Sequence, residues 1–247
     1  MKMKIKIINP NTLLEMTDRI RESAEQYARP ETEIVCVSPE KGPITIEDYY
    51  DEAIATVGVM EEVQKGEREE GGYDGYIIAC FGDPGLYQCR EITEVPVVGI
   101  AESSLLLATT LGTKFSILGI LDRFKVPYEE LVHKVGLQSR CAAVVCNDVT
   151  VQDFEKDRGK AKNALLEAGK KAIKEYGAEV MCLGCAGMAG LDIELEKALG
   201  VPVLDPIGAA VKVCEGLIEL GKKTSKINTF KPPEKKEIKG YPKILQP

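Results

Sequence analysis

Two stretches of this chain, YIIACFGDPGL at residues 76–86 and VMCLGCAGMAGL at residues 180–191, follow one pattern. In each, an apolar run ends near a cysteine, Cys80 or Cys185, and a loop of small residues follows. A second apolar run, which opens with Val-Pro-Val, begins 15 residues after Cys80 and 16 residues after Cys185. This internal repeat predicts two similar lobes with a site between them. Such a site suits two-base proton transfer, with one thiol on each face of a carbon atom.

Strand and helix signals alternate along both halves of the chain. The runs that predict strands are residues 4–8, 33–37, 76–80, 95–100, 115–120, 142–146, 180–185 and 201–204. Helices are predicted over residues 12–27, 46–65, 127–135, 156–176 and 207–220. Strands that alternate with helices form parallel sheets covered on both faces. The prediction is an α/β fold with two pseudo-symmetric lobes, each a mainly parallel four-stranded sheet flanked by helices.

Two of the predicted helices carry local signals. Residues 12–15, TLLE, form a capping box that opens the first helix at Thr12. The second helix is predicted from apolar residues at helical spacing, which are Tyr50, Ala53, Ile54, Val57 and Met60. The last helix is expected to pack back on the first lobe. Lobe 1 is therefore predicted as residues 1–102 with 207–221, and lobe 2 as residues 103–206.

The last 26 residues, 222–247, form a basic tail with eight Lys and two Glu, a net charge of +6. Because the whole chain carries −7, the residues before the tail carry −13. An acidic body is a poor nucleic-acid binder, so no nucleic-acid partner is expected. The tail itself is interpreted as a solvated extension or an arm packed on a neighbour, with contact to RNA or a membrane surface as the alternative.

Length and composition indicate a globular protein, with 247 residues of which 44% are hydrophobic and 29% charged. No apolar run approaches the roughly 20 residues that a membrane span needs, so no membrane contact is expected. The first apolar stretch is too short for a secretory signal, and we expect a cytoplasmic protein. Its eight cysteines are then expected as thiols. Six of them are interpreted as small buried hydrophobes, namely Cys36, Cys89, Cys141, Cys146, Cys182 and Cys214.

The candidate site follows from the strand ends, because ligands of parallel sheets bind beyond the carboxyl ends of the strands. Cys80 and Cys185 lie there and are the candidate catalytic residues. Backbone N–H groups in small-residue loops can bind a carboxylate or an enolate oxygen and favour a thiolate over a thiol. The candidate substrate-binding residues are Asn11, Phe81, Gly82, Asp83, Ala186 and Gly187. Asp83 is also interpreted as a turn residue before Pro84.

Other chemistry is disfavoured by the residue pattern. Cys182 and Cys185 have the spacing of a zinc or dithiol site, but no second such pair exists in the sequence. His133 is the only histidine, follows no nucleophile signature and is predicted to lie on a helix surface. The glycines around Cys185 are not followed by the Gly-Lys-Ser/Thr of a phosphate loop. We therefore expect no metal.

The segments INPNT at residues 8–12, ACFGDPGL at 79–86 and LGCAGM at 183–188 resemble the aspartate/glutamate/hydantoin racemase superfamily. GPITIEDYYDE at 42–52 is similar to the hydantoin and allantoin racemase branch, and the likeness covers roughly residues 4–220. Ala186 stands where glutamate racemases typically carry a histidine. Residues 117–123 lack the Thr-Thr pair that hydantoin-type relatives often carry, which predicts a more apolar pocket on that side.

The resemblance implies a cofactor-independent racemase with a small-molecule substrate, two cysteines as its bases and a homo-oligomeric assembly. The expected reaction inverts the C5 stereocentre of 5-substituted hydantoins. Alternatives on the same scaffold are an allantoin or amino-acid racemase, a cofactor-free decarboxylase and a cis–trans isomerase. A non-catalytic binding protein is a further alternative, which inert thiols at Cys80 and Cys185 would support.

Overall fold

The first half of the chain builds a four-stranded parallel sheet. The computed structural model describes residues 2–148 and 157–246. In spatial order the strands are β2 (Thr32–Val37), β1 (Met3–Ile8), β3 (Gly75–Ile78) and β4 (Val97–Gly99). The central strands β1 and β3 pair Ile7 with Ile77, and both side chains are fully buried. Apolar side chains of this kind fill the core of a sheet that is covered on both faces.

The second half repeats this topology. Its strands, in spatial order, are β6 (Cys141–Cys146), β5 (Phe115–Gly119), β7 (Val180–Leu183) and β8 (Val203–Leu204). All pairings are parallel, and each half places its first strand between its second and third strands. All eight predicted strands are present, with ends that differ by a few residues. The prediction of an α/β fold with two four-stranded parallel sheets is confirmed.

The chain divides into two compact units. Unit 1 comprises Met1–Ala79, Asp83–Gly99 and Val211–Pro247, and unit 2 comprises Cys80–Gly82 and Ile100–Ala210. The three-residue segment that begins at Cys80 therefore groups with unit 2, although β3 before it belongs to unit 1. Both cysteines of the repeated motif consequently lie in unit 2.

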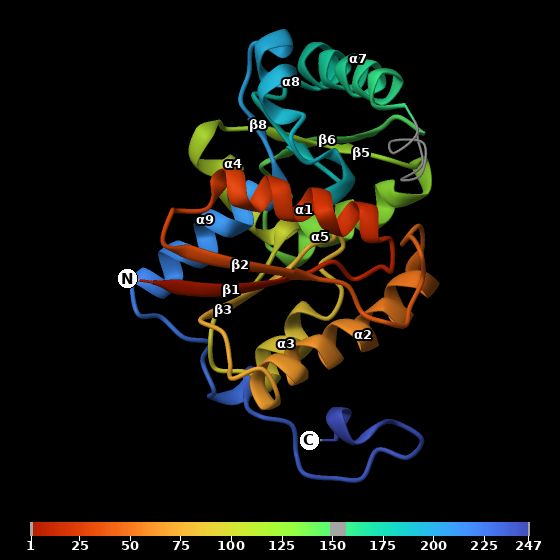
Figure 1. Ribbon diagram of the computed structural model, residues 1–247. Coiled ribbons are helices and arrows are strands. Elements are labelled where there is room, and N and C mark those ends of the chain that lie inside the picture. The colour runs from red at the N-terminus through yellow and green to blue at the C-terminus, as the bar shows by residue number, and fades with distance from the viewer. Residues whose placement is uncertain (1, 149–156, 247) are drawn as a thin grey trace. The chain divides into compact units, whose positions relative to one another are not determined.

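Among the described residues, three helices that lie wholly within unit 1 pack on its sheet. They are α1 (Leu14–Tyr27), α2 (Tyr49–Arg68) and α3 (Leu86–Ile92). Helix α1 lies over one face, and α2 and α3 lie side by side on the other (Figure 1). The short helix α3 was not predicted from the sequence, because its single face of buried residues spans only two turns.

The start of α1 differs from the predicted capping box. The N-cap residue is Leu13, whose side chain caps nothing. The hydroxyl of Thr12 instead donates to the carbonyl of Pro43 at 3.3 Å. The carboxamide oxygen of Asn11 accepts from the backbone N–H of Leu13 at 3.0 Å. The capping prediction was wrong because a contact with a loop distant in sequence occupies the Thr12 side chain.

Helix α2 begins later than predicted and buries another face. Its N-cap is Asp48, whose side chain accepts from a backbone N–H in the first turn. Ala55, Val59 and Val63, spaced four residues apart, are the apolar residues that face the sheet. The five residues on which the helix was predicted are exposed or only half-buried. The helix prediction was therefore right in kind, but its predicted apolar positions do not form the buried face.

Within its described residues, unit 2 holds four helices and the start of a fifth. They are α4 (Ile100–Leu111), α5 (Lys125–Lys134), α7 (Arg158–Tyr176), α8 (Asp192–Leu199) and α9 (Pro206–Glu219), which ends in unit 1. The sequence predicted α5, α7 and α9, and the predicted start of α7 at Lys156 lies outside the described residues. Helices α4 and α8 were missed. No helix within the described residues is both long and apolar enough to cross a membrane.

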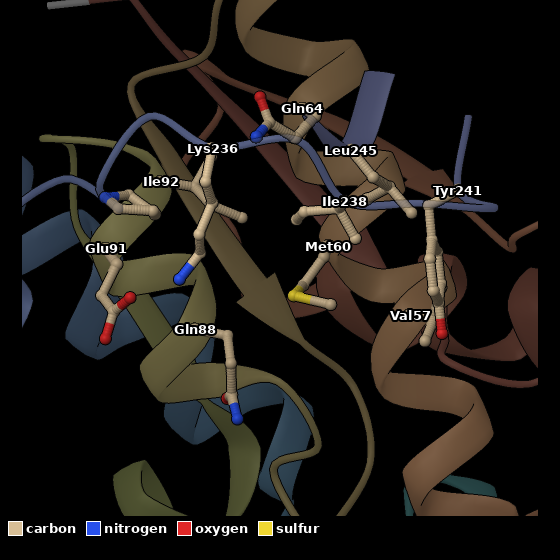
Figure 2. Close-up of a pocket in the computed structure, with 11 residues that line it drawn as sticks. Val57, Met60, Gln64, Gln88, Glu91, Ile92, Lys236, Ile238, Tyr241 and Leu245 are labelled. Atoms are coloured by element: carbon tan, nitrogen blue, oxygen red, sulfur yellow. The ribbon is translucent and has the colours of Figure 1, made fainter. Parts of the chain in front are cut away.

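The basic tail packs on its own unit. The backbone N–H of Thr224 donates to the carbonyl of Glu94 at 2.8 Å, and the ring of Phe230 meets Tyr87 edge-on at 5.7 Å. Further along, Ile238, Tyr241 and Leu245 lie over α2 and α3 and line a pocket of about 380 Å³. Figure 2 shows these three side chains beside Val57 and Met60 of α2. The expectation of a solvated extension is therefore wrong for these parts of the tail, although most of its lysines are exposed.

Helix α9 is fastened to β2 by a buried carboxylate. The side chain of Glu215 is 1% exposed. It accepts from the backbone N–H of Arg29 at 2.8 Å, from the hydroxyl of Thr32 at 2.7 Å and from the ammonium of Lys212 at 2.9 Å. Burial alone would raise the pKa of Glu215, but these donors stabilise its charged form and hold the pKa below its usual value.

We expect Glu215→Gln to lower the free energy of unfolding by about 2 kcal/mol at pH 7, because hydrogen bonds to a charged acceptor are lost. The folded-state pKa lies below the unfolded-state value, so this stabilisation is present at neutral pH. It disappears as the pH falls through the folded-state pKa, and the two proteins should converge there. Urea unfolding at several pH values measures the difference. Glu167→Gln, which breaks an exposed ion pair with Lys170, is the control.

Candidate active site

The two cysteines of the repeat lie at equivalent places, just beyond the carboxyl ends of central strands. Strand β3 ends at Ile78, two residues before Cys80, and β7 ends at Leu183, two residues before Cys185. The predicted strands ran up to the cysteines, so the structure shortens both by two residues. Each cysteine therefore lies in the loop that follows its strand and not within the sheet.

Both loops turn at a glycine in the same position. Gly85 and Gly190 each follow their cysteine by five residues, and each has φ +77°. This left-handed conformation is strained for a residue with a side chain. Helix α3 starts directly after Gly85, and α8 starts two residues after Gly190. The sequence repeat therefore corresponds to a repeated backbone geometry.

Cys185 is held by its own loop. Its side chain is 7% exposed, and its sulfur accepts a hydrogen bond from the backbone N–H of Gly187 at 3.4 Å. The residues after it, Ala186–Met188, form a single 3-10 turn. An N–H directed at sulfur favours the thiolate over the thiol. Cys80 is half-buried and so is more accessible than Cys185.

Asp83, three residues after Cys80, is buried and carries backbone strain. Its side chain is 8% exposed and its φ is +50°. Its carbonyl accepts from the backbone N–H of Leu86 at 3.2 Å, which confirms the turn role that Pro84 suggested. The Asp83 carboxylate occupies the space that a side chain at Gly99 would fill. The carboxylate therefore fits only because Gly99, at the end of β4, has no side chain.

Asp205 provides the corresponding carboxylate of the second half and was missed by the sequence analysis. Counted from the Val-Pro-Val runs, Asp205 is equivalent to Gly99. Its side chain is 4% exposed and accepts from the backbone N–H groups of Gly190, Ile207 and Gly208 at 2.7, 2.8 and 2.9 Å. Burial raises the pKa of Asp205, although the three N–H groups oppose the shift. It ties the Cys185 loop to the start of α9.

The predicted substrate contact Asn11 lies in unit 1 and is 4% exposed. Its carboxamide oxygen accepts from the side chain of Asn9 at 2.8 Å and from the backbone N–H of Leu13 at 3.0 Å. The amide nitrogen donates to the sulfur of Met16 at 3.2 Å. Asn11 therefore organises the loop between β1 and α1. Its contact with a substrate stays a prediction.

The remaining predicted contacts lie directly beside the cysteines in unit 2. Phe81 is 2% exposed, and its ring meets that of Tyr128 edge-on. Ala186 is 1% exposed, and Gly187 points its N–H at the Cys185 sulfur. Gly82 is half-buried. The roles of these backbone groups toward a substrate stay predictions.

Burial raises the pKa of each of the six other cysteines. The pKa rises to about 11 for Cys141 and to about 12 for Cys36 and Cys146. The rise is larger for the three fully buried thiols, which are Cys89, Cys182 and Cys214. These three confirm the expectation of buried hydrophobes, whereas the other three are only half-buried. A thiol with a raised pKa is a poor source of thiolate at neutral pH.

The zinc-like spacing of Cys182 and Cys185 does not produce a shared site. Cys182 lies on β7, fully buried, and its thiol donates to the carbonyl of Ser104 at 3.8 Å. Cys185 lies beyond the strand and accepts from Gly187. Among the described residues, no group of three or more His, Cys, Asp or Glu side chains is arranged to hold a metal ion. His133 is exposed on α5, as predicted.

The family model described as Asp/Glu/Hydantoin racemase matches residues 5–214. The chain is 51% identical to the hydantoin racemase of Pseudomonas sp. (strain NS671), over 96% of this chain and 95% of that protein. It is 42% identical to the hydantoin racemase of Paenarthrobacter aurescens, over 95% and 99%. The structure of an allantoin racemase from Klebsiella pneumoniae superposes with a TM-score of 0.95 at 43% identity, covering 99% of both chains.

We expect Gly99→Ala to lower the free energy of unfolding by about 3 kcal/mol, because the new methyl group overlaps the Asp83 carboxylate. In an Asp83→Gly background the same substitution should cost far less. Equal costs in both backgrounds, measured by urea unfolding, would disprove the steric relation. Gly216→Ala is the matched control, since a Cβ there meets nothing within 4 Å and lies within α9, where alanine is favourable.

Proposed function

Because the chain belongs to the Asp/Glu/hydantoin racemase family, we propose that it inverts the C5 stereocentre of 5-substituted hydantoins by proton transfer through Cys80 and Cys185. The observation that carries the mechanism is the repeated loop, which presents one cysteine two residues beyond each of two equivalent strands. The identity with hydantoin racemases over nearly the whole chain supports the substrate class.

The chemistry begins with an acidic C–H bond. The C5 proton of a hydantoin is acidified by the adjacent C4 carbonyl, and a thiolate on one face removes it. The electron pair of the C–H bond moves toward the carbonyl oxygen and gives an enolate. The thiol on the other face then donates its proton to C5, and that sulfur is left as the thiolate. No atom is gained or lost, and the configuration at C5 is inverted.

The proposal places demands on both thiols. One must begin as a thiolate, and a thiol with an ordinary pKa of about 8.5 is mostly protonated at neutral pH. The N–H of Gly187 directed at the Cys185 sulfur supports the charged form of that residue. A tetrahedral carbon must also fit between the sulfurs with two proton-transfer contacts of about 3–3.5 Å, so the proposal requires a separation of roughly 7–9 Å.

Allantoin is the second candidate substrate. It is itself a hydantoin with a ureido group on C5, so the same two-thiol chemistry applies. The observation in its favour is the near-complete superposition on the Klebsiella pneumoniae structure described as allantoin racemase. The two candidates differ only in the group that C5 carries.

A polarimetric screen with no added cofactor decides between the candidates. Single enantiomers of alkyl- and aryl-substituted hydantoins, allantoin and free amino acids are the substrates. We expect optical rotation to decay to zero with the hydantoins and to remain unchanged with amino acids. Decay with allantoin alone would move the assignment to the second candidate, and decay with amino acids alone would overturn both.

The second test separates the roles of the thiols. We expect Cys80→Ser and Cys185→Ser each to lower racemisation at least about 100-fold, because a hydroxyl is a far weaker base than a thiolate. Each variant should still exchange the C5 proton with deuterium for one enantiomer, since the remaining cysteine serves its own face. The two variants should favour opposite enantiomers. NMR of each pure enantiomer in D₂O measures the exchange.

Cys36→Ser is the control for this test, because Cys36 is half-buried like Cys80 and its thiol donates to the carbonyl of Thr17. Near wild-type racemisation by both site variants would overturn the two-thiol mechanism. Exchange of the same enantiomer by both would overturn the assignment of opposite faces.

A further inference from the structure

One buried tyrosine in unit 2 contacts the neighbours of both cysteines. Tyr128 lies on α5 and is 3% exposed. Its hydroxyl donates to the carbonyl of Gly184 at 2.6 Å. Gly184 directly precedes Cys185, so this bond holds the peptide group from which Cys185 extends.

The ring of the same tyrosine meets the other loop. The centroids of Tyr128 and Phe81 are 5.6 Å apart and the rings are inclined by 84°. This is the edge-to-face arrangement that aromatic pairs favour. Phe81 directly follows Cys80 and is 2% exposed, so the ring of Tyr128 is part of what packs this residue in place.

The tyrosine is itself closely packed. Its ring stacks on that of Phe124 at 5.5 Å with an inclination of 26°. A Cβ at Gly119, the last residue of β5, would lie 2.9 Å from the Tyr128 ring. A Cβ at Gly184 would lie 2.8 Å from the carbonyl oxygen of Leu118. Both glycines therefore permit the close approach of β5, α5 and the loop before Cys185.

We propose that Tyr128 is a positioning residue that holds the two cysteine loops in place relative to each other. The hydroxyl holds Cys185 through Gly184, and the ring holds Cys80 through Phe81. This inference rests on the proposed two-cysteine function and adds to it the side chain that fixes the geometry. Small displacements of reacting groups cost large factors in rate, so such support is a condition for proton transfer on two faces.

We expect the hydroxyl and the ring of Tyr128 to have separate effects. Tyr128→Phe removes the hydroxyl and keeps the ring, so only the Cys185 loop loses its bond. We expect deuterium exchange to fall about 10-fold for the enantiomer that Cys185 serves, with little change for the other. Tyr128→Leu removes the ring as well, and exchange should fall for both enantiomers. The Cys80→Ser and Cys185→Ser variants identify which enantiomer each cysteine serves.

A second readout is independent of turnover. Alkylation of Cys185 by iodoacetamide, followed by peptide mass spectrometry across pH, reports its thiolate fraction. In Tyr128→Phe we expect the midpoint to move to higher pH, because a loosened loop weakens the bond from Gly187 to the sulfur. Tyr73→Phe is the matched control, since that buried tyrosine also donates a hydrogen bond of 2.6 Å, to Glu70.

The outcomes distinguish this inference from the function on which it rests. Undiminished racemisation in both cysteine variants overturns the two-thiol function, whatever Tyr128 does. If the cysteine variants behave as proposed but Tyr128→Phe changes neither the exchange nor the alkylation midpoint of Cys185, the positioning role is overturned. An equal loss for both enantiomers in Tyr128→Phe and Tyr73→Phe also overturns it, because general destabilisation then explains the effect.

Discussion

The central strands of both sheets are buried on both faces, and this constraint decides where chemistry can occur. A buried polar group needs partners, so a strand of this kind is almost entirely apolar. Lys6 on β1 shows the cost of an exception, because its fully buried ammonium is met by the carboxylates of Glu62 and Glu70 at 3.1 and 3.0 Å. In unit 1 this cluster fastens α2 to the sheet. Cys80 and Cys185 lie in the loops beyond the strand ends, outside the sheets.

The two halves of the chain share the backbone geometry of the cysteine loops, although many of the residues in these loops differ. Glycine with φ +77° follows each cysteine by five residues, and each loop has a buried carboxylate beside it. In unit 1 the carboxylate comes from the loop, as Asp83, and glycine stands at the end of the strand opposite. In unit 2 it comes from the strand end, as Asp205, and the loop glycine donates to it. Each half therefore has a buried carboxylate near its cysteine loop, but the carboxylate comes from the loop in unit 1 and from the strand end in unit 2.

The sequence predicted the parts of the fold that local patterns encode. Every strand within the described residues was predicted, because most of these strands are short runs rich in apolar residues. Helix α4 was missed because it follows β4 without a break, and its first residue, Ile100, had been included in the predicted strand. The cysteine loops were predicted from the repeat, whereas Tyr128 and Asp205 were not. Their roles arise from contacts with residues 56 and 15 positions away, and nothing in the adjacent sequence marks them.

The proposed mechanism has a further consequence for the two thiols. Each inversion leaves the protons exchanged, so the enzyme that has converted one enantiomer is prepared only for the reverse reaction. Repeated turnover in one direction therefore requires both cysteines to exchange protons with solvent. Cys80 is half-buried and Cys185 is 7% exposed with an N–H on its sulfur, so the two environments are unequal. Under the proposed mechanism we therefore expect proton exchange with solvent to be slower at the more deeply buried Cys185 than at Cys80.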